Sequence, residues 1–142
     1  MHFGASMFFT DYSMAPAELA VALEQRGFEI VWAPEHSHIP VSRKTPFIMG
    51  GDLPKRYYDA MDPFVTLTAA AMATKTLKIG TGVCLIAQRD PIQTAKLVAS
   101  IDQISGGRFS LASAMAGTRM RWRTTAPSSP AATSWRARTL RR

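Results

Sequence analysis

The stretch Lys78-Ile79-Gly80-Thr81-Gly82-Val83-Cys84-Leu85-Ile86 decides the fold, because it has the pattern of a buried strand that runs into a glycine-broken bend. It leads to Asp90-Pro91, where aspartate suits the N-cap and proline suits the first turn of a helix. In parallel α/β folds the carboxyl ends of strands carry the ligands, so residues 80–85 form the first candidate site. The alternative is that the glycines only allow close backbone packing.

The segments on both sides of this stretch repeat the same unit of strand and helix. Expected strands and helices alternate along the chain. The strands are at 2–8 and 28–33, in the stretch 78–86 before its bend, and from 108 onward, and the helices are at 16–26, 64–73 and 91–104. A long excursion rich in proline and glycine, residues 34–62, follows the second strand. This alternation predicts an α/β fold with a parallel sheet and right-handed crossovers.

Periodicity alone does not separate an open doubly wound sheet from the first part of a barrel. An eight-stranded barrel needs roughly 200 residues or more, so 142 residues supply only about half of one. The third helix has a predicted apolar face made of Ile92, Ala95, Leu97, Val98 and Ile101, and Ser105-Gly106-Gly107 ends it.

The composition is that of one globular domain with a core of its own. Cys84 is the single cysteine, which excludes a disulfide framework. The first residues lack the pattern of a signal peptide, and no apolar run approaches the roughly 20 residues of a membrane helix. A reducing cytoplasm is therefore the expected compartment.

The net charge of +7 belongs to one end of the chain. Residues 1–110 hold ten Lys or Arg and ten Asp or Glu, whereas residues 111–142 hold seven Arg and no acidic residue. The chain is therefore divided into an N-terminal domain, residues 1–110, and an Arg-rich tail. One alternative function follows from this tail, that of a small protein that binds nucleic acid or an acidic partner. The tail lacks interleaved aromatic residues, which makes nucleic acid the weaker hypothesis.

Four blocks occur in a specific order: Glu24-Gln25-Arg26-Gly27-Phe28, Trp32-Ala33-Pro34-Glu35-His36-Ser37-His38-Ile39-Pro40, Gly80-Thr81-Gly82-Val83, and Asp102-Gln103-Ile104-Ser105-Gly106-Gly107-Arg108-Phe109. Together they resemble the luciferase-like monooxygenase family, and within it the oxidoreductases that use the deazaflavin coenzyme F420. The resemblance covers residues 1 to about 109. It implies the first four β/α units of a (β/α)₈ TIM barrel about twice as long as this chain.

The resemblance also implies a cofactor, F420 or alternatively FMN, at the carboxyl ends of the strands. Hydride or oxygen chemistry with a small organic substrate takes place on the cofactor's face, and full-length relatives are expected to be homodimers. The cofactor contacts carried over from the family are the pocket residue Ser6 and the bend residues Thr81, Gly82, Val83, Cys84 and Leu85. In the family this bend is often made with a non-prolyl cis peptide, and a glycine leaves room for a planar ring.

Cys84 has an alternative role as a nucleophile. No basic partner accompanies it in the sequence, which favours a small buried hydrophobe instead.

His36 is the second carried-over site. An imidazole that titrates near neutral pH suits proton transfer to or from a substrate hydroxyl, and Glu35 is the candidate to orient it. The alternatives are that His36 and His38 satisfy loop backbone groups, or that they bind a metal, for which the sequence offers no convincing third and fourth ligands.

The family pattern is lost after Phe109. At this position the family's sequence pattern has Gly-x-Gly-Trp-Asn, an acidic helix and an Asn-His-Gly-Thr turn, whereas this chain continues with a sequence rich in arginine, alanine and threonine. A back-translation shifted by one base from Ser113 onward permits Gly-Asp-Gly-Trp-Asn-Gln-Asp-Glu-Val-Glu-Asn-His-Gly-Thr, which is the expected block. We therefore predict a frameshift, a poorly ordered tail at residues 111–142, and an activity that is lost or much reduced.

Overall fold

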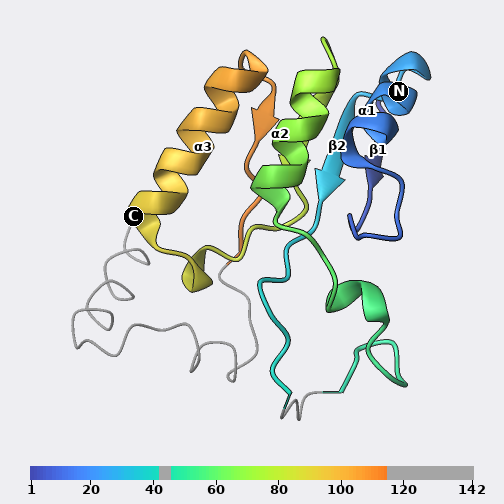
Figure 1. Ribbon diagram of the computed structural model, residues 1–142, viewed down its shortest axis with the longest axis vertical. Coiled ribbons are helices and arrows are strands. Elements are labelled where there is room, and N and C mark those ends of the chain that lie inside the picture. Colours follow the sequence, from blue (N-terminus) through green and yellow to red (C-terminus); the bar gives the residue numbers. More distant parts are fainter. Residues whose placement is uncertain (42–45, 115–142) are drawn as a thin grey trace.

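The computed structural model describes residues 1–41 and 46–114 (Figure 1). The elements in order are β1 (Gly4–Ser6), α1 (Pro16–Gln25), β2 (Ile30–Ala33), the 3-10 helix η1 (Lys55–Tyr57), α2 (Pro63–Ala73), β3 (Lys78–Thr81), the 3-10 helix η2 (Ile86–Gln88), α3 (Pro91–Ser105) and β4 (Phe109–Ser110). The predicted alternation of strand and helix is confirmed, although the strands are shorter than expected. Within the described ranges no helix has the length and apolar character needed to cross a bilayer.

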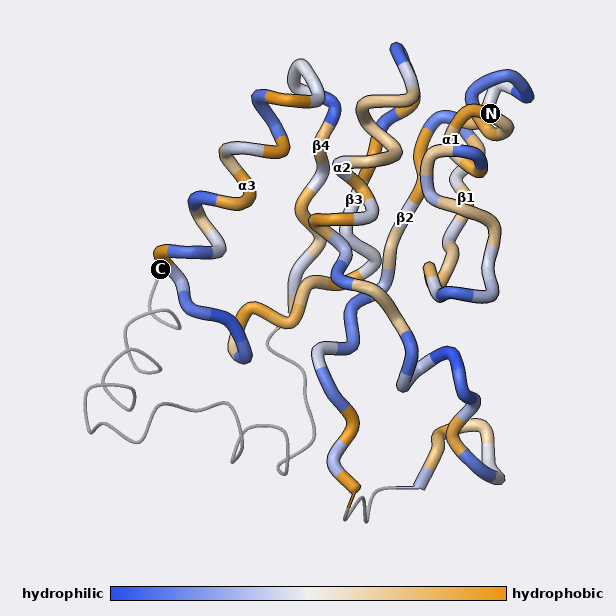
Figure 2. Tube along the Cα trace, in the orientation of Figure 1, coloured by the Kyte–Doolittle hydropathy of each residue, from blue (hydrophilic) through white to orange (hydrophobic). Residues whose placement is uncertain are grey.

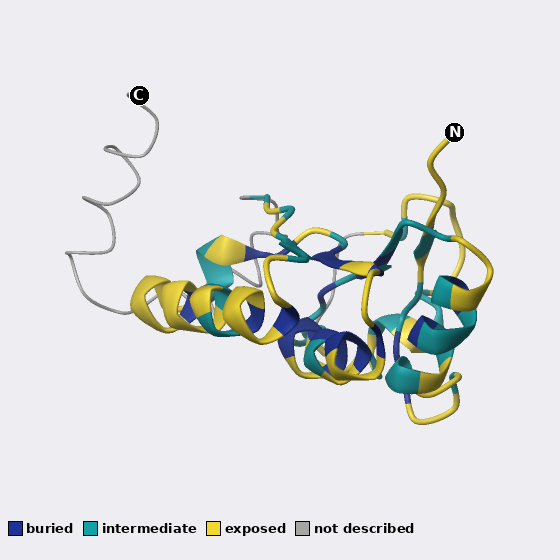
Figure 3. Ribbon diagram, turned by 90° about the horizontal axis from the view of Figure 1, so that it is seen from above, coloured by how far each residue is buried: buried dark blue, intermediate teal, exposed yellow. Residues whose placement is uncertain are grey.

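The sheet has the strand order β1-β2-β3-β4, and each strand is parallel to its neighbours. The three α-helices lie on one face of this sheet (Figure 3). A doubly wound sheet carries helices on both faces, whereas a barrel carries them only on the outside. The arrangement therefore resolves the ambiguity of the sequence in favour of a barrel-type sheet.

The core lies between the sheet and the helices. Val31 and Ile79 are opposite one another on β2 and β3, and both are fully buried. Leu67 of α2 and Ile101 of α3 are almost fully buried in the same cluster. One buried hydrophobic layer thus joins the central strands to their covering helices.

The opposite face of the sheet carries Trp32, which has glycine on both neighbouring strands. A Cβ added to Gly80 would lie 2.3 Å from Cζ3 of Trp32, and one added to Gly4 would lie 3.2 Å from its Nε1. The indole therefore extends across β1, β2 and β3 only because these two positions lack side chains.

Local capping chemistry fixes the start of α2 and, as predicted, both ends of α3. Asp62 Oδ1 accepts a hydrogen bond from Phe64 N (2.8 Å), and Asp90 Oδ1 accepts one from Gln93 N (2.8 Å). Gly106 takes φ 67° at the end of α3, a left-handed conformation that glycine adopts without steric cost.

The buried face of α3 differs from the predicted apolar face. Ile101 is buried, but Ile92 is 78% exposed and Leu97 is 40% exposed. Thr94 and Ser105 point inward instead, because their hydroxyls bond backbone carbonyls one turn away. Apolar and polar residues alternate along α3 (Figure 2), so hydropathy alone left its inward face ambiguous.

Glu24, at the end of α1, holds the turn before β3. Its Oε1 accepts hydrogen bonds from the backbone N of Lys75 (2.9 Å), Thr76 (2.6 Å) and Leu77 (2.9 Å), and from the Thr76 hydroxyl (2.9 Å). The backbone donors of Thr76 and Leu77 are the main cause that lowers the pKa of Glu24 from 4.5 to about 2. This block of the family resemblance therefore has a structural role at the amino-terminal end of a strand.

Replacing Glu24 with glutamine should destabilise the fold at neutral pH. The pKa of Glu24 is depressed in the folded state, so the carboxylate's contribution is complete above about pH 4.5 and is lost as the pH falls towards 2. The difference in urea midpoint between wild type and Glu24→Gln should shrink over that interval. Glu18→Gln, an exposed residue of the same helix, is the matched control. A difference that does not change with pH would contradict the assignment.

Candidate functional site

β3 ends at Thr81, and the chain then turns at Gly82 and Val83, the position at which the bend was predicted. All peptide bonds of the described residues are trans, unlike the cis bend that the resemblance led us to expect. Val83 makes the turn with φ 82°, the one positive φ outside glycine in this part of the chain. A β-branched residue rarely adopts this conformation, which indicates that its surroundings enforce it.

Backbone hydrogen bonds hold the bend on both sides of Val83. Gly82 N donates to Ala33 O (2.7 Å), and Cys84 N donates to Ala112 O (2.7 Å). Val83 itself is 42% exposed, and its N–H has no partner among the described residues. The bend therefore presents one backbone donor at the carboxyl end of the sheet.

Gly82 is required by the backbone packing. A Cβ at this position would lie 3.1 Å from Pro34 N and 3.3 Å from Ala33 C. This close contact supports the alternative that Gly82 serves backbone packing. The predicted role of Gly82, to leave room for a cofactor ring, stays a separate prediction.

Thr81 and Cys84 are both buried beside the segment that follows β4. The Thr81 hydroxyl donates to Ala112 O (2.8 Å) and accepts from Ala112 N (3.0 Å). Cys84 pairs with Ser113 as a parallel bridge, so the sheet pairing continues past residue 110. Neither side chain faces solvent.

The Cys84 thiol is unsuited to nucleophilic chemistry. Burial, followed by the neighbouring charge of Glu35, raises the pKa of Cys84 from 9.0 to about 12. A thiol with this pKa stays protonated at neutral pH, and only the thiolate is strongly nucleophilic. The alternative of a small buried hydrophobe therefore describes Cys84 better.

Glu35 belongs to an ion-pair network with Arg89 and Asp62. The Glu35 side chain is 2% exposed; its Oε2 accepts from Leu85 N (2.7 Å) and its Oε1 accepts from Arg89 Nε (2.5 Å). Arg89 Nη2 also donates to Asp62 Oδ2 (2.5 Å), and the guanidinium lies 4.8 Å above the Phe64 ring. We name Glu35, Arg89 and Asp62 the carboxylate–arginine network.

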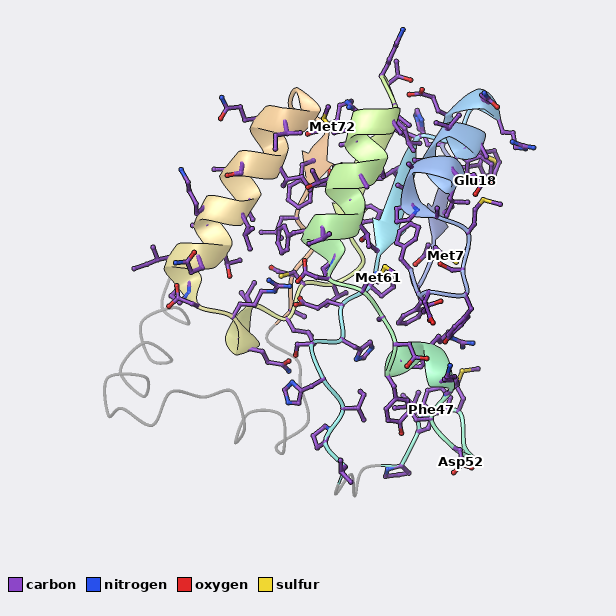
Figure 4. The ribbon with its side chains drawn as sticks, in the orientation of Figure 1. Met7, Glu18, Phe47, Asp52, Met61 and Met72 are labelled. Carbon is purple, nitrogen blue, oxygen red and sulfur yellow. The ribbon has the colours of Figure 1, made fainter. Side chains whose placement is uncertain are left out.

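His36 lies in an aromatic cluster formed by Phe8, His36, Phe47 and Tyr57. The imidazole stacks on Phe8 with centroids 5.9 Å apart, and it meets Tyr57 edge-on at 5.0 Å. Phe47 contacts Tyr57 beside η1, on the excursion beyond the carboxyl ends of the strands (Figure 4). His36 is half-buried, so its ring is held by packing and still reaches solvent.

The segment that carries His36 runs beside the loop between β3 and α3. Glu35 bonds Leu85 in this loop, and Ser37 Oγ donates to Gln88 Oε1 (3.0 Å). His36 lies between these two attachments. The two predicted site segments are therefore neighbours in space although about 45 residues separate them in the chain.

Ser6 lies on the sheet face that carries no helix, on the same face as Trp32, which is its register partner on β2. It is exposed and belongs to the same row as Gly80. Ser6, Trp32 and Gly80 are in register two residues before Gly82, further from the carboxyl ends of the strands. Ser6 is therefore further from the centre of the candidate site than the bend is. Within residues 1–41 and 46–114, no three His, Cys, Asp or Glu side chains gather as a metal site.

Sequence reasoning missed Arg89, Phe8 and Tyr57. A signal for Arg89 was present, because a carboxylate in a buried segment such as Glu35 needs a positive partner, and Arg89 precedes the next helix cap. The aromatic cluster had no such signal, since Phe8 and Tyr57 come from segments whose contact depends on the course of the excursion.

Comparisons with known proteins agree with this geometry. Residues 14–121 match the sequence profile described as luciferase-like monooxygenase. An uncharacterized protein of Mycobacterium tuberculosis is 40% identical over 114 residues, covering 78% of this chain and 40% of that protein. The coenzyme F420-dependent tetrahydromethanopterin reductase of Methanopyrus kandleri superposes with a TM-score of 0.64 at 25% identity, covering 89% of this chain and 30% of that one.

The oxygenating constituent of 3,6-diketocamphane monooxygenase of Pseudomonas putida, solved in complex with FMN, shares the fold. It has a TM-score of 0.66 at 18% identity, and the match covers 89% of this chain and 32% of that one. The chain thus spans two fifths or less of the length of each of these three proteins. The Arg-rich tail at residues 115–142 lies outside the described residues, as does the sequence after the predicted frameshift at Ser113 apart from residues 113 and 114. Residues 111–114 were predicted to be poorly ordered, and this is wrong for Ala112, Ser113 and Ala114, which pair with Cys84.

Proposed function

Because the chain belongs to the luciferase-like monooxygenase family, we propose that it supplies the ring-facing part of a flavin- or deazaflavin-dependent oxidoreductase site. The observation that carries this proposal is the Val83 bend, whose backbone N–H has no partner among residues 1–41 and 46–114; it lies at the carboxyl ends of the strands, beside the segment that holds His36. Ligands of barrel enzymes bind at this end of the sheet.

The residues of the bend fit a flat, largely apolar ring with polar edges. Val83 is exposed and Gly82 is half-buried, and among the described residues the Val83 N–H has no hydrogen-bond partner, so it can donate to an acceptor atom on a ring. The side chains of Thr81, Cys84 and Leu85 are buried and support the bend from the protein interior. When bound, F420 or FMN would supply the capacity to accept or donate a hydride.

His36 is the proposed proton-transfer residue. Its ring is fixed by Phe8 and Tyr57, which limits its orientation, and an imidazole takes up and releases protons near neutral pH. His36 would hold or accept the proton of a hydroxyl on a small organic substrate. The catalytic role predicted for Glu35 stays a prediction, since both of its oxygens have backbone or arginine partners.

The experiment is a fluorescence titration of the chain with riboflavin, FMN and F420. The described site residues would contact only the ring of a cofactor, and by family resemblance the groups that hold cofactor phosphates lie later in the pattern. We therefore expect weak, saturable binding in which riboflavin and FMN differ by less than about threefold. Absence of saturable binding of any of the three would refute the proposed site. Tight FMN binding with no affinity for riboflavin would refute its restriction to the ring.

A further inference from the structure

Arg89 bridges two carboxylates that belong to different segments of the chain. Glu35 follows β2, whereas Asp62 is the N-cap of α2, and Arg89 itself lies between η2 and α3. The Arg89 side chain is 17% exposed and that of Glu35 is 2% exposed, so the pair is largely shielded from water. A fork-shaped guanidinium can serve two carboxylates at once, which a lysine cannot do with the same geometry.

We propose that Arg89 is a positioning residue which, through Glu35 and Asp62, holds the Val83 bend in its ligand-facing conformation. The consequence for cofactor binding rests on the proposed function. The positioning itself concerns only the protein and can be tested without a cofactor.

The first step of the argument is that the Val83 conformation needs support. A valine at φ 82° is disfavoured, and it persists where neighbouring contacts leave the chain no other course. Gly82 and Cys84 are held by backbone bonds to Ala33 and Ala112. The next N–H, that of Leu85, has a side chain as its partner.

The second step is that this side chain depends on Arg89. The carboxylate of Glu35 accepts from Leu85 N at 2.7 Å while it is buried, and burying a carboxylate without a positive partner is costly. Arg89 provides that partner at 2.5 Å. Loss of Arg89 would therefore weaken the side-chain hydrogen bond that holds Leu85, at the end of the bend that leads to α3.

The third step is that Asp62 ties this attachment to α2. Asp62 uses Oδ1 to cap α2 and Oδ2 to bind Arg89, so its two roles are separable. Asn caps helices about as well as Asp, but it carries no charge for Arg89. Asp62→Asn therefore removes the ion pair and keeps the cap.

Cys84 is the reporter for the test, because it is the only cysteine in the chain and lies fully buried inside the bend. The rate of its alkylation by iodoacetamide is measured in wild type, Arg89→Gln and Asp62→Asn, together with urea unfolding of each. We expect alkylation to be about tenfold faster in Arg89→Gln and about threefold faster in Asp62→Asn, beyond the change that global stability predicts. Arg26→Gln, at an exposed arginine distant from the bend, should match wild type.

Two results would overturn the proposal. The first is alkylation at the wild-type rate in both variants. The second is acceleration that follows global stability alone, which would indicate a purely structural ion pair. If Arg89→Gln does not fold, Asp62→Asn decides the question, because its helix cap is preserved.

The riboflavin titration separates this proposal from the proposed function. Faster alkylation together with weaker riboflavin binding supports both. Faster alkylation with unchanged riboflavin affinity overturns the link between the bend and the ligand. If wild type binds none of riboflavin, FMN and F420, the proposed function fails, and the positioning role is then tested by the alkylation rates alone.

Discussion

Replacing Arg108 with methionine should lower the free energy of unfolding by about 3 kcal/mol or more, the largest stability effect expected in this chain. The guanidinium makes five hydrogen bonds, to the carbonyls of Ala71 (2.8 Å), Thr74 (3.2 Å), Leu77 (2.7 Å) and Ser105 (2.7 Å) and to the Thr74 hydroxyl (3.0 Å). It thereby joins the end of α2, the turn before β3 and the end of α3. Methionine would remove these five donated bonds from half-buried acceptors.

Urea unfolding followed by circular dichroism measures the Arg108 effect. Arg108→Lys should recover only part of the loss, because an ammonium group cannot reach acceptors on both helices at once. Arg26→Met is the matched control, since Arg26 makes one exposed hydrogen bond to Ala22 O (2.8 Å) and should cost less than about 0.5 kcal/mol. Equal midpoints for Arg108→Met and Arg26→Met would show that this assignment is wrong.

Gly80→Ala should be the second most damaging change, at about 1–3 kcal/mol. The new Cβ would lie 2.3 Å and 2.5 Å from Cζ3 and Cε3 of Trp32, and 3.1 Å from Ser110 O. Relief requires the indole to leave its position across the three strands, which also displaces its contact with Gly4.

A double-mutant cycle with Trp32→Ala isolates the Gly80 effect. If the indole is the cause, Gly80→Ala should cost much less in the Trp32→Ala background than in wild type, so that the two changes are non-additive. Additive losses would point instead to the contact with Ser110 O. The four proteins are compared by urea unfolding at one pH.

The caps and turns could be predicted from the sequence because their chemistry is local. Asp62 and Asp90 cap their helices through side chains that reach two or three residues ahead, and Gly106 supplies a left-handed φ. The end of β3 was predicted from the family resemblance and not from local chemistry. An apolar run to Ile86 is compatible with a strand, and only the turn at Val83 ends it.

The side of the sheet on which the helices lie also had no local signal. Periodicity identifies a helix and its apolar stripe, but the handedness and direction of successive crossovers decide whether one face or both are covered. Even the stripe was ambiguous in α3, where Thr94 is buried and Ile92 is exposed. A hydroxyl that bonds its own helix is buried at low cost, which a hydropathy pattern does not register.

The candidate site was predicted mainly from family resemblance, and the contacts that organise it were not. His36 and the bend were identified as site segments, and the structure places them side by side. The partnership of Glu35 with Arg89 spans 54 residues and depends on two loops meeting. Such a pair is specified by tertiary packing, so spacing along the chain does not reveal it.

The hydrogen bonds made by Glu24 and Arg108 lie at the amino-terminal ends of the strands, at the end of the sheet opposite the bend and the aromatic cluster. Mutations that accumulate in the loops around His36 would therefore leave these anchors intact. Substitutions in natural or directed evolution can change the chemistry at the carboxyl ends of the strands while the contacts at their amino-terminal ends keep the protein folded. Libraries that randomise the excursion should consequently yield a larger share of folded members than libraries of equal size aimed at residues 74–77 and 105–108.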